Sequence, residues 1–185
     1  LNFFNNIKKQ NFKTNLNFVF VGRTIKEKGI YEYCEAANKI LDIFDNITFS
    51  IIGFNKFEHL YKKYPKIIFI ESENISKLDY INYDCLILPS YREGLPRSVL
   101  EFSLLGIPSI VTNVPGCRTI IKDDFNGLIC EPYSNDSLVS SIIKYINFPL
   151  DKKLKMSYNA KKYVEKNFNE IDVINKYLEI FDEQY

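Results

Sequence analysis

Residues 84 to 106, DCLILPSYREGLPRSVLEFSLLG, join an apolar run, a charged loop and the start of an amphipathic segment. The four apolar residues at 85 to 88 have the composition and length of a buried strand, and Pro89 ends it because proline cannot donate to a sheet. Pro96 suits the first turn of a helix that carries apolar residues as far as Leu105. A strand followed by a charged loop and a helix N-terminus is where open α/β sheets place ligands.

The same alternation of strand and helix continues on both sides of this stretch. Besides 85–88, we predict strands at 17–21, 47–52, 67–70, 109–111 and 127–130, and helices at 30–41, 57–63, 76–83, 134–146, 150–167 and 171–181. Parallel strands joined by right-handed crossovers produce this order. The sequence therefore predicts an α/β fold with a parallel sheet of five or six strands covered on both faces.

Length and composition favour one soluble domain. The chain has 185 residues, 46% of them hydrophobic and 15% aromatic, which suffices for one sizeable core. Its net charge of +1 provides no electrostatic reason to expect nucleic acid or an anionic membrane as a partner. There is no apolar run of transmembrane length and no signal-peptide pattern, so a cytosolic domain is favoured.

The cysteines and the N-terminus carry two further expectations. Four widely spaced cysteines without a C-x-x-C pair make zinc and disulfide readings weak, and we expect buried, reduced thiols. The chain starts at Leu1 and its only methionine is Met156, so we expect a fragment of a longer protein. Residues 1–15 are polar and rich in Asn and Lys, as in a linker or docking segment.

Two glutamates, Glu93 and Glu101, are eight residues apart, one in the central loop and one on the following helix. At just over two helical turns they are able to line one concave face. One interpretation is the acid and base pair of a glycosidase, which needs a set separation across the substrate. The other is a solvated loop charge and a surface helix charge, and the spacing by itself leaves both open.

A basic loop follows the first predicted strand. It reads GRTIKEKG and places Arg23 and Lys28 five residues apart, without matching a Walker A loop or a G-x-G-x-x-G fingerprint. Arginine offers a fixed fork and lysine a point charge, so this pair at a strand end suits a diphosphate. An ordinary basic surface loop is the alternative. Because strand ends meet at one edge of a parallel sheet, we expect this loop and the Glu93 loop to open side by side.

Other polar segments carry weaker signals. NVPGCR at 113–118 contains Pro115-Gly116, which reads as a turn, and the glycine also allows a backbone to approach a ligand closely. His59 lies in a polar helical segment and is expected at the surface. The aromatic residues follow core spacing and are expected to pack rather than to stack on bases.

Four stretches together carry a family resemblance. VGRTIKEKG, LPSYREGLPRSVLE, GIPSIVTNVPGCR and DDFNGLICEP, in this order and spacing, resemble the C-terminal, donor-binding domain of family 4 retaining glycosyltransferases of the GT-B fold. The likeness covers roughly residues 16 to 182 and is nearest to bacterial enzymes that build capsule, O-antigen or lipid-linked oligosaccharides. It implies a Rossmann-like three-layer α/β/α domain, the C-terminal half of a GT-B fold.

The resemblance implies roles for the charged residues already singled out. Arg23 and Lys28 match the family's donor-diphosphate ligands. Glu93 matches the first glutamate of the family's E-x7-E spacing, which contacts the donor sugar, and Glu101 matches the second, which holds the ribose hydroxyls. By this likeness the catalytic residues are Glu93, Arg23 and Lys28.

The resemblance also implies the rest of the donor site. Gly94 and Leu95 match backbone positions near the sugar and the distal phosphate, at a helix N-terminus that suits an anion. No metal and no cofactor is expected, because the two basic side chains and the helix dipole are able to stabilise a departing nucleoside diphosphate. The expected donor is a UDP-sugar.

The same likeness implies a domain plan and partners. Residues 1–15 would be the remnant of an interdomain hinge, 16–168 the nucleotide-sugar-binding domain, and 169–185 a C-terminal helix packing toward a missing N-terminal domain. That missing half would bind a glycan or lipid-linked acceptor and make any membrane contact. The expected location is cytoplasmic, at the inner face of the membrane for the full-length protein.

The expected function is the donor-binding part of a retaining glycosyltransferase that moves a hexose or an N-acetylhexosamine from a UDP-sugar. The fragment by itself is expected to bind UDP weakly and to transfer nothing. Two alternatives stay open at this point: a stand-alone nucleotide-sugar-binding subunit of a split glycosyltransferase, and a GT-B sugar-nucleotide epimerase.

Overall fold

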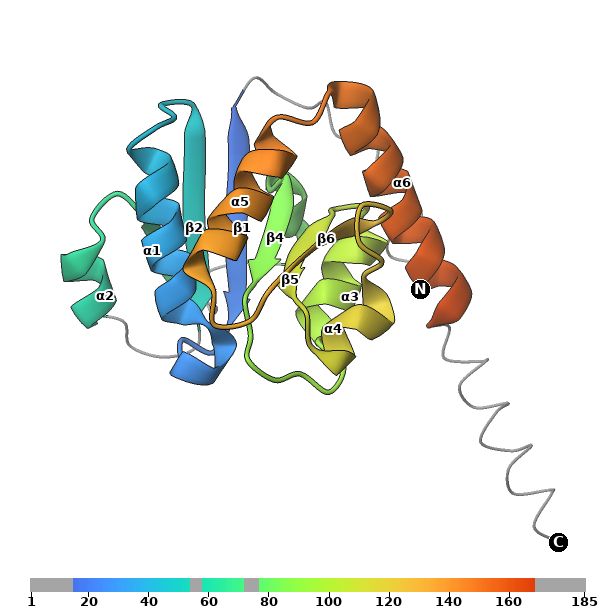
Figure 1. Ribbon diagram of the computed structural model, residues 1–185, viewed down its shortest axis with the longest axis horizontal. Coiled ribbons are helices and arrows are strands. Elements are labelled where there is room, and N and C mark those ends of the chain that lie inside the picture. The colour runs from blue at the N-terminus through green and yellow to red at the C-terminus, as the bar shows by residue number, and fades with distance from the viewer. Residues whose placement is uncertain (1–14, 54–57, 72–76, 169–185) are drawn as a thin grey trace, which may run out of the picture.

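A six-stranded parallel sheet forms the centre of the protein (Figure 1). The structure is a computed structural model, and it describes residues 15–53, 58–71 and 77–168. The strands are β1 (Leu16–Gly22), β2 (Ile47–Gly53), β3 (Ile68–Glu71), β4 (Cys85–Leu88), β5 (Ser109–Thr112) and β6 (Gly127–Cys130), in the spatial order β3-β2-β1-β4-β5-β6. The predicted parallel sheet of five or six strands is confirmed.

Helices cover both faces of this sheet. They are α1 (Ile30–Leu41), α2 (Glu58–Lys63), α3 (Arg97–Leu104), α4 (Pro115–Ile120), α5 (Asn135–Ile146) and α6 (Leu150–Asn167), with the 3₁₀ helices η2 (Lys26–Lys28) and η4 (Lys77–Asn82). Figure 1 shows α1 and α5 in front of the sheet, where they contact each other. Right-handed crossovers in the opposite direction place α3 and α4 on the other face, and α6 packs on α3 there. The three-layer α/β/α prediction is confirmed.

The centre of the sheet determines where a ligand site can form. β1 and β4 are neighbours and run parallel, with Phe18 opposite Cys85 and Val19 opposite Leu86. The chain proceeds from β1 toward β3 in one direction and from β4 toward β6 in the other, so the strand order reverses between these two strands. In an open α/β sheet this reversal leaves a crevice at the carboxyl ends of the strands. The loops after β1 and β4 therefore lie at one place.

Three local predictions differ from the structure. Pro115-Gly116, expected as a turn, begins α4, because a proline at the first helical position already has the required φ and lacks an N–H that would have no partner. Pro96 is the N-cap of α3 rather than part of its first turn, with extended backbone angles. The helix expected at 76–83 is the 3₁₀ helix η4.

Several other predictions concern surface and core. All four cysteines are buried and free, as expected. His59 is exposed on α2. Among the described residues, no helix combines the length and hydropathy that a bilayer crossing requires. The linker predicted at 1–15, except for its last residue, and the helices predicted at 169–185 and 171–181 lie outside the described residues.

Candidate functional site

A cavity of about 480 Å³ opens at the carboxyl ends of β1 and β4. It is lined by Val21, Gly22, Arg23, Lys28, Tyr80, Leu88, Glu93, Leu95, Pro96, Arg97, Ser98 and Glu101. Five of the six site residues predicted from the sequence are in this set, and Gly94 is not. Arg23 and Lys28 come from the loop after β1, while the glutamates come from the loop after β4 and from α3, so the two segments meet as adjacent strand ends require.

An ion pair joins the two loops inside the cavity. Nζ of Lys28 lies 2.6 Å from Oε1 of Glu93, and these side chains are 22% and 8% exposed, respectively. Lys28 is the last residue of η2, and Gly29 follows it in the left-handed conformation at φ 70°. Glycine adopts this conformation without strain, so the chain turns sharply into α1 directly after Lys28.

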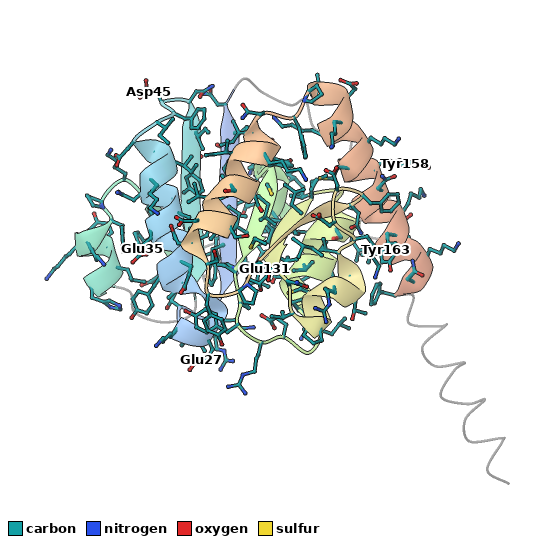
Figure 2. The ribbon with its side chains drawn as sticks, in the orientation of Figure 1. Glu27, Glu35, Asp45, Glu131, Tyr158 and Tyr163 are labelled. Atoms are coloured by element: carbon teal, nitrogen blue, oxygen red, sulfur yellow. The ribbon has the colours of Figure 1, made fainter. Side chains whose placement is uncertain are left out.

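The backbones of the two loops are also fastened to each other. The amide of Tyr91 donates to the carbonyl of Glu27 at 2.9 Å. A Cβ added at Gly29 would lie 2.0 Å from the carbonyl oxygen of Pro89, so no side chain fits between the loops. Figure 2 shows Glu27 at the lower end of the sheet, beneath α1, where these loops gather. The two loops are therefore closely packed on this side of the cavity.

α4 packs against the loop that carries Glu93 and Gly94. A Cβ added at Gly116 would lie 2.1 Å from the carbonyl oxygen of Gly94 and 2.4 Å from that of Glu93. The sequence suggested that this glycine lets the backbone approach a ligand. The structure shows that the close approach is to the loop carrying Glu93, because Gly116 begins a helix that packs against that loop.

A hydrogen bond to α1 anchors the same loop on the opposite sheet face. The Tyr91 hydroxyl donates to Oε1 of Glu32, and the Tyr91 ring lies against the ring of Tyr133 with 4.0 Å between centroids. Desolvation, followed by the bond to the Glu32 carboxylate, raises the pKa of Tyr91 well above its usual value. The tyrosine therefore stays protonated and continues to donate.

Tyr80 and Arg97 line the cavity, and sequence reasoning missed both. Tyr80 comes from η4 and stacks on Phe102 at 4.7 Å, and its pKa is raised by burial and by the Glu101 carboxylate beside it. No sequence signal marks Tyr80, because its placement depends on how η4 crosses the sheet. Arg97 did have a signal, a basic residue beside Pro96 at the start of the helix of Glu101.

The cavity combines cationic and anionic side chains. Arg23, Lys28 and Arg97 supply positive charge, and the N-terminus of α3 adds a partial positive charge at the same wall. Glu93 and Glu101 supply carboxylates, which accept hydrogen bonds from hydroxyl groups. The arrangement suits a ligand that carries both phosphates and hydroxyls. Within the described ranges, no group of three His, Cys, Asp or Glu side chains is placed to hold a metal ion.

A second cavity, of about 500 Å³, lies between α6 and the turn that precedes β6. Lys152 and Asp124 pair there at 2.9 Å, and Lys144 lies 3.5 Å from the same carboxylate. The turn enters β6 at its amino end, so this cavity is at the sheet edge opposite the first one. None of the predicted site residues lines it.

Comparison with known proteins assigns this architecture. The model of the family "Glycosyl transferases group 1" matches residues 2–163. The chain is 27% identical over 179 residues to the UDP-Gal:alpha-D-GlcNAc-diphosphoundecaprenol alpha-1,3-galactosyltransferase of Escherichia coli, covering 89% of this chain and 44% of the relative. It is 27% identical over 167 residues to the capsular polysaccharide biosynthesis glycosyltransferase CapM of Staphylococcus aureus, covering 84% and 43%.

Solved structures of glycosyltransferases have the same fold. The C-terminal domain of a glycosyl transferase group 1 family protein, LpcC, from Francisella tularensis superposes with a TM-score of 0.75 at 25% identity, covering 84% of this chain and 87% of that domain. HepE from Anabaena, solved in complex with UDP-glucose, has a TM-score of 0.77 at 16% identity, covering 92% and 49%. The likeness to HepE is one of fold.

The sheet order and the cavity at its reversal define an open α/β domain whose candidate site lies at the carboxyl edge of the sheet. The chain belongs to the group 1 glycosyltransferase family, and its fold is that of the C-terminal domain of GT-B glycosyltransferases. The resemblance drawn from the sequence is thereby confirmed. The chain spans less than half the length of the two relatives described above.

Proposed function

We propose that the cavity binds the diphosphate and sugar of a UDP-sugar, and that the chain is the donor-binding part of a retaining glycosyltransferase. The observation that carries this proposal is the gathering of Arg23, Lys28, Glu93 and Glu101 around one cavity at the carboxyl ends of β1 and β4. The Escherichia coli relative has UDP-Gal in its name, which favours uracil as the base.

Each cationic group has a role in holding the diphosphate. The Arg23 guanidinium offers two parallel N–H groups to phosphate oxygens, and Lys28 contributes a compact charge. The N-terminus of α3 faces the distal phosphate. As the bond between sugar and phosphate breaks, negative charge grows on the departing diphosphate, and these groups stabilise it without a metal ion.

The carboxylates select the groups on either side of the diphosphate. Glu93, in the loop after β4, accepts hydrogen bonds from hydroxyls of the donor sugar, and Gly94 with Leu95 brings backbone close to that sugar. Glu101, deeper along α3, accepts from the ribose hydroxyls. Tyr80 stands beside Glu101, and its raised pKa keeps it protonated as a further donor in this part of the cavity.

The complete reaction needs an acceptor-binding half. We propose that the sugar moved is a hexose or an N-acetylhexosamine and that the acceptor is a glycan or a lipid-linked saccharide. One relative is named as an N-acetylgalactosaminyltransferase acting on a diphospho-undecaprenol-linked sugar. The full-length protein would work in the cytoplasm, with any membrane contact made by the acceptor-binding half.

Calorimetric titration of the chain tests the proposal. UDP and UDP-galactose should bind with a Kd of about 0.1 to 1 mM, corresponding to about −4 to −5.5 kcal/mol. Cytidine 5′-monophosphate, which lacks the diphosphate, serves as the control and should bind much more weakly. Absence of UDP binding at millimolar concentration would contradict the proposed site. The configuration at the anomeric carbon is determined by NMR on the product of the full-length protein.

A further inference from the structure

Lys28 has a protein partner inside the cavity. Its ammonium nitrogen lies 2.6 Å from Oε1 of Glu93. The Glu93 side chain is 8% exposed. The function proposed above requires Lys28 to hold phosphate and Glu93 to hold sugar hydroxyls, and neither group can do so fully while they bind each other. The pair therefore has to open or be shared when the donor enters.

We propose that this ion pair makes the cavity distinguish a nucleotide-sugar from the nucleoside diphosphate left after transfer. The inference rests on the proposed function and adds to it a selectivity between donor and product. Glu93 holds Lys28 and releases it only when sugar hydroxyls replace the ammonium group as partners of the carboxylate. A bare diphosphate offers no such replacement.

The backbone around Glu93 keeps the carboxylate in place. The Glu93 carbonyl is pressed against Gly116, where a Cβ would lie 2.4 Å away. Upstream in the same loop, the Tyr91 amide bonds to the Glu27 carbonyl, and Gly29 sits against Pro89. The backbone of the loop that carries Glu93 is thus held from two sides, so opening the pair requires the side chains to move and not the loop.

The α4 side of the pair offers no charged group in place of Lys28. Cys117 in α4 is buried near both groups, and burial raises the pKa of its thiol to about 12, with Glu93 adding to the rise and Lys28 opposing it. The thiol is therefore neutral. If a diphosphate draws Lys28 away, Glu93 remains largely buried, loses the ion-pair partner that it has in the structure and lies close to new negative charge, which is unfavourable.

The sugar of the donor removes this penalty. Its hydroxyls donate to the Glu93 carboxylate, so the donor satisfies Lys28 through phosphate and Glu93 through sugar at once. After the sugar has left, Glu93 loses those donors and competes with the diphosphate for Lys28. The pair closes again and favours release of the product.

Neutralising Glu93 tests the proposal, because glutamine keeps the shape and removes the charge. For Glu93→Gln we expect UDP to bind about tenfold more tightly than to the unaltered chain, a change of about 1.4 kcal/mol. UDP-galactose and UDP-N-acetylgalactosamine should gain less or lose affinity, because the charged acceptor for their hydroxyls is gone. The ratio of donor to UDP affinity therefore falls. Calorimetry measures all three ligands.

Two matched variants carry the same chemical change. Glu101→Gln, in the same cavity, should weaken UDP binding, opposite in sign to Glu93→Gln. Glu27→Gln, on the exposed part of the loop after β1, should leave UDP affinity unchanged and controls for net charge. Lys28→Gln combined with Glu93→Gln should lose most of the tightening, because the competition concerns Lys28.

The outcomes separate the two proposals. Tighter UDP binding in Glu93→Gln with a fallen donor-to-UDP ratio supports the inference. UDP binding that this variant leaves unchanged or weakens overturns it while leaving the proposed function intact. An unaltered chain that binds neither UDP nor either UDP-sugar overturns both. Thermal unfolding verifies that each variant is folded, and Glu93→Ser, which also removes the charge, replaces a glutamine variant that does not fold.

Discussion

A small set of charged side chains lines the cavity for which we propose donor binding. Arg23 and Lys28 on one loop face Glu93 and Glu101 on the next segment along the edge of the sheet. Positive charge alone would suit any anion, and the two carboxylates restrict the choice to ligands that also carry hydroxyl groups. The side chains therefore define the chemical class of the ligand more narrowly than the fold does.

Glu101→Gln should weaken UDP binding by about 1 to 2 kcal/mol, which is about 5- to 30-fold in Kd. The reason is that an ionised carboxylate accepts from ribose hydroxyls more strongly than an amide oxygen does. Calorimetry with UDP and with 2′,3′-dideoxyuridine 5′-diphosphate measures the effect. The dideoxy ligand should bind the variant and the unaltered chain equally, and unchanged UDP affinity would remove Glu101 from the ribose site.

At the scale of elements, the loops after β1 and β4 pack tightly against each other. The loop after β1 contacts the loop after β4 through Gly29 and the Tyr91 amide, and α4 supports the latter loop through Gly116. Close backbone contacts of this kind leave no room for side chains, so they constrain the backbone of both loops. Two glycines are thus as important to the site as its charges.

Gly116→Ala should lower the unfolding free energy by about 2 kcal/mol and Tm by about 5 °C, because the added methyl group would overlap the carbonyl oxygens of Glu93 and Gly94. UDP affinity should fall with it. Gly94→Ala is the matched control, since a Cβ at Gly94 meets no atom within 4 Å and Tm should hold. Equal Tm values for the two variants would show that the loop adapts without strain.

Tyr91→Phe tests the hydrogen bond between the loop after β4 and α1. It removes the hydrogen bond to Oε1 of Glu32, whose Oε2 is buried without a hydrogen-bond partner in the described part of the chain. We expect a loss of about 2 kcal/mol of unfolding free energy, seen in urea unfolding. Tyr158→Phe, the same change on an exposed face of α6, should have no effect. A stable Tyr91→Phe variant would mean that the bond contributes little.

At the scale of the whole molecule, buried ionisable groups make stability depend on pH. Burial raises the pKa of the thiols of Cys34, Cys117 and Cys130 from 9.0 to about 12, and it raises the pKa of the Cys85 thiol well above 9.0. In the unfolded chain these thiols ionise near pH 9, while in the folded protein they stay protonated. Their contribution is fully present below pH 9 and is lost as pH rises from 9 toward about 12.

The unfolding free energy should therefore fall above pH 9, each of the four buried thiols contributing about 1.4 kcal/mol per pH unit. Urea unfolding at several pH values between 8 and about 10.5 measures this slope. Cys34→Ala should show a shallower slope than the unaltered chain, since it removes one of the four buried thiols. A free energy that stays constant over this range would contradict the burial of the thiols in solution.

The order of strands and helices follows from local patterns. Continuous apolar runs such as Cys85–Leu88 mark strands that are buried on both faces, and apolar residues three and four apart mark helices such as Ile30–Leu41. Both were predicted at their observed positions. Pro115-Gly116 was read as a turn because the pair is compatible with a turn and with a helix start, and only packing of α4 on the glutamate loop decides between them.

The sequence by itself determined the three-layer fold, the strand ends that carry Arg23, Lys28 and Glu93, and the family, because periodicity, turn chemistry and motif spacing are local properties of the chain. Tertiary structure alone decided the rest: that Lys28 pairs with Glu93, that Tyr80 lines the cavity, and that Gly116 packs against the loop after β4. These contacts join segments tens of residues apart across the sheet. Their distances depend on how β1, β4 and the helices pack, which no local pattern encodes.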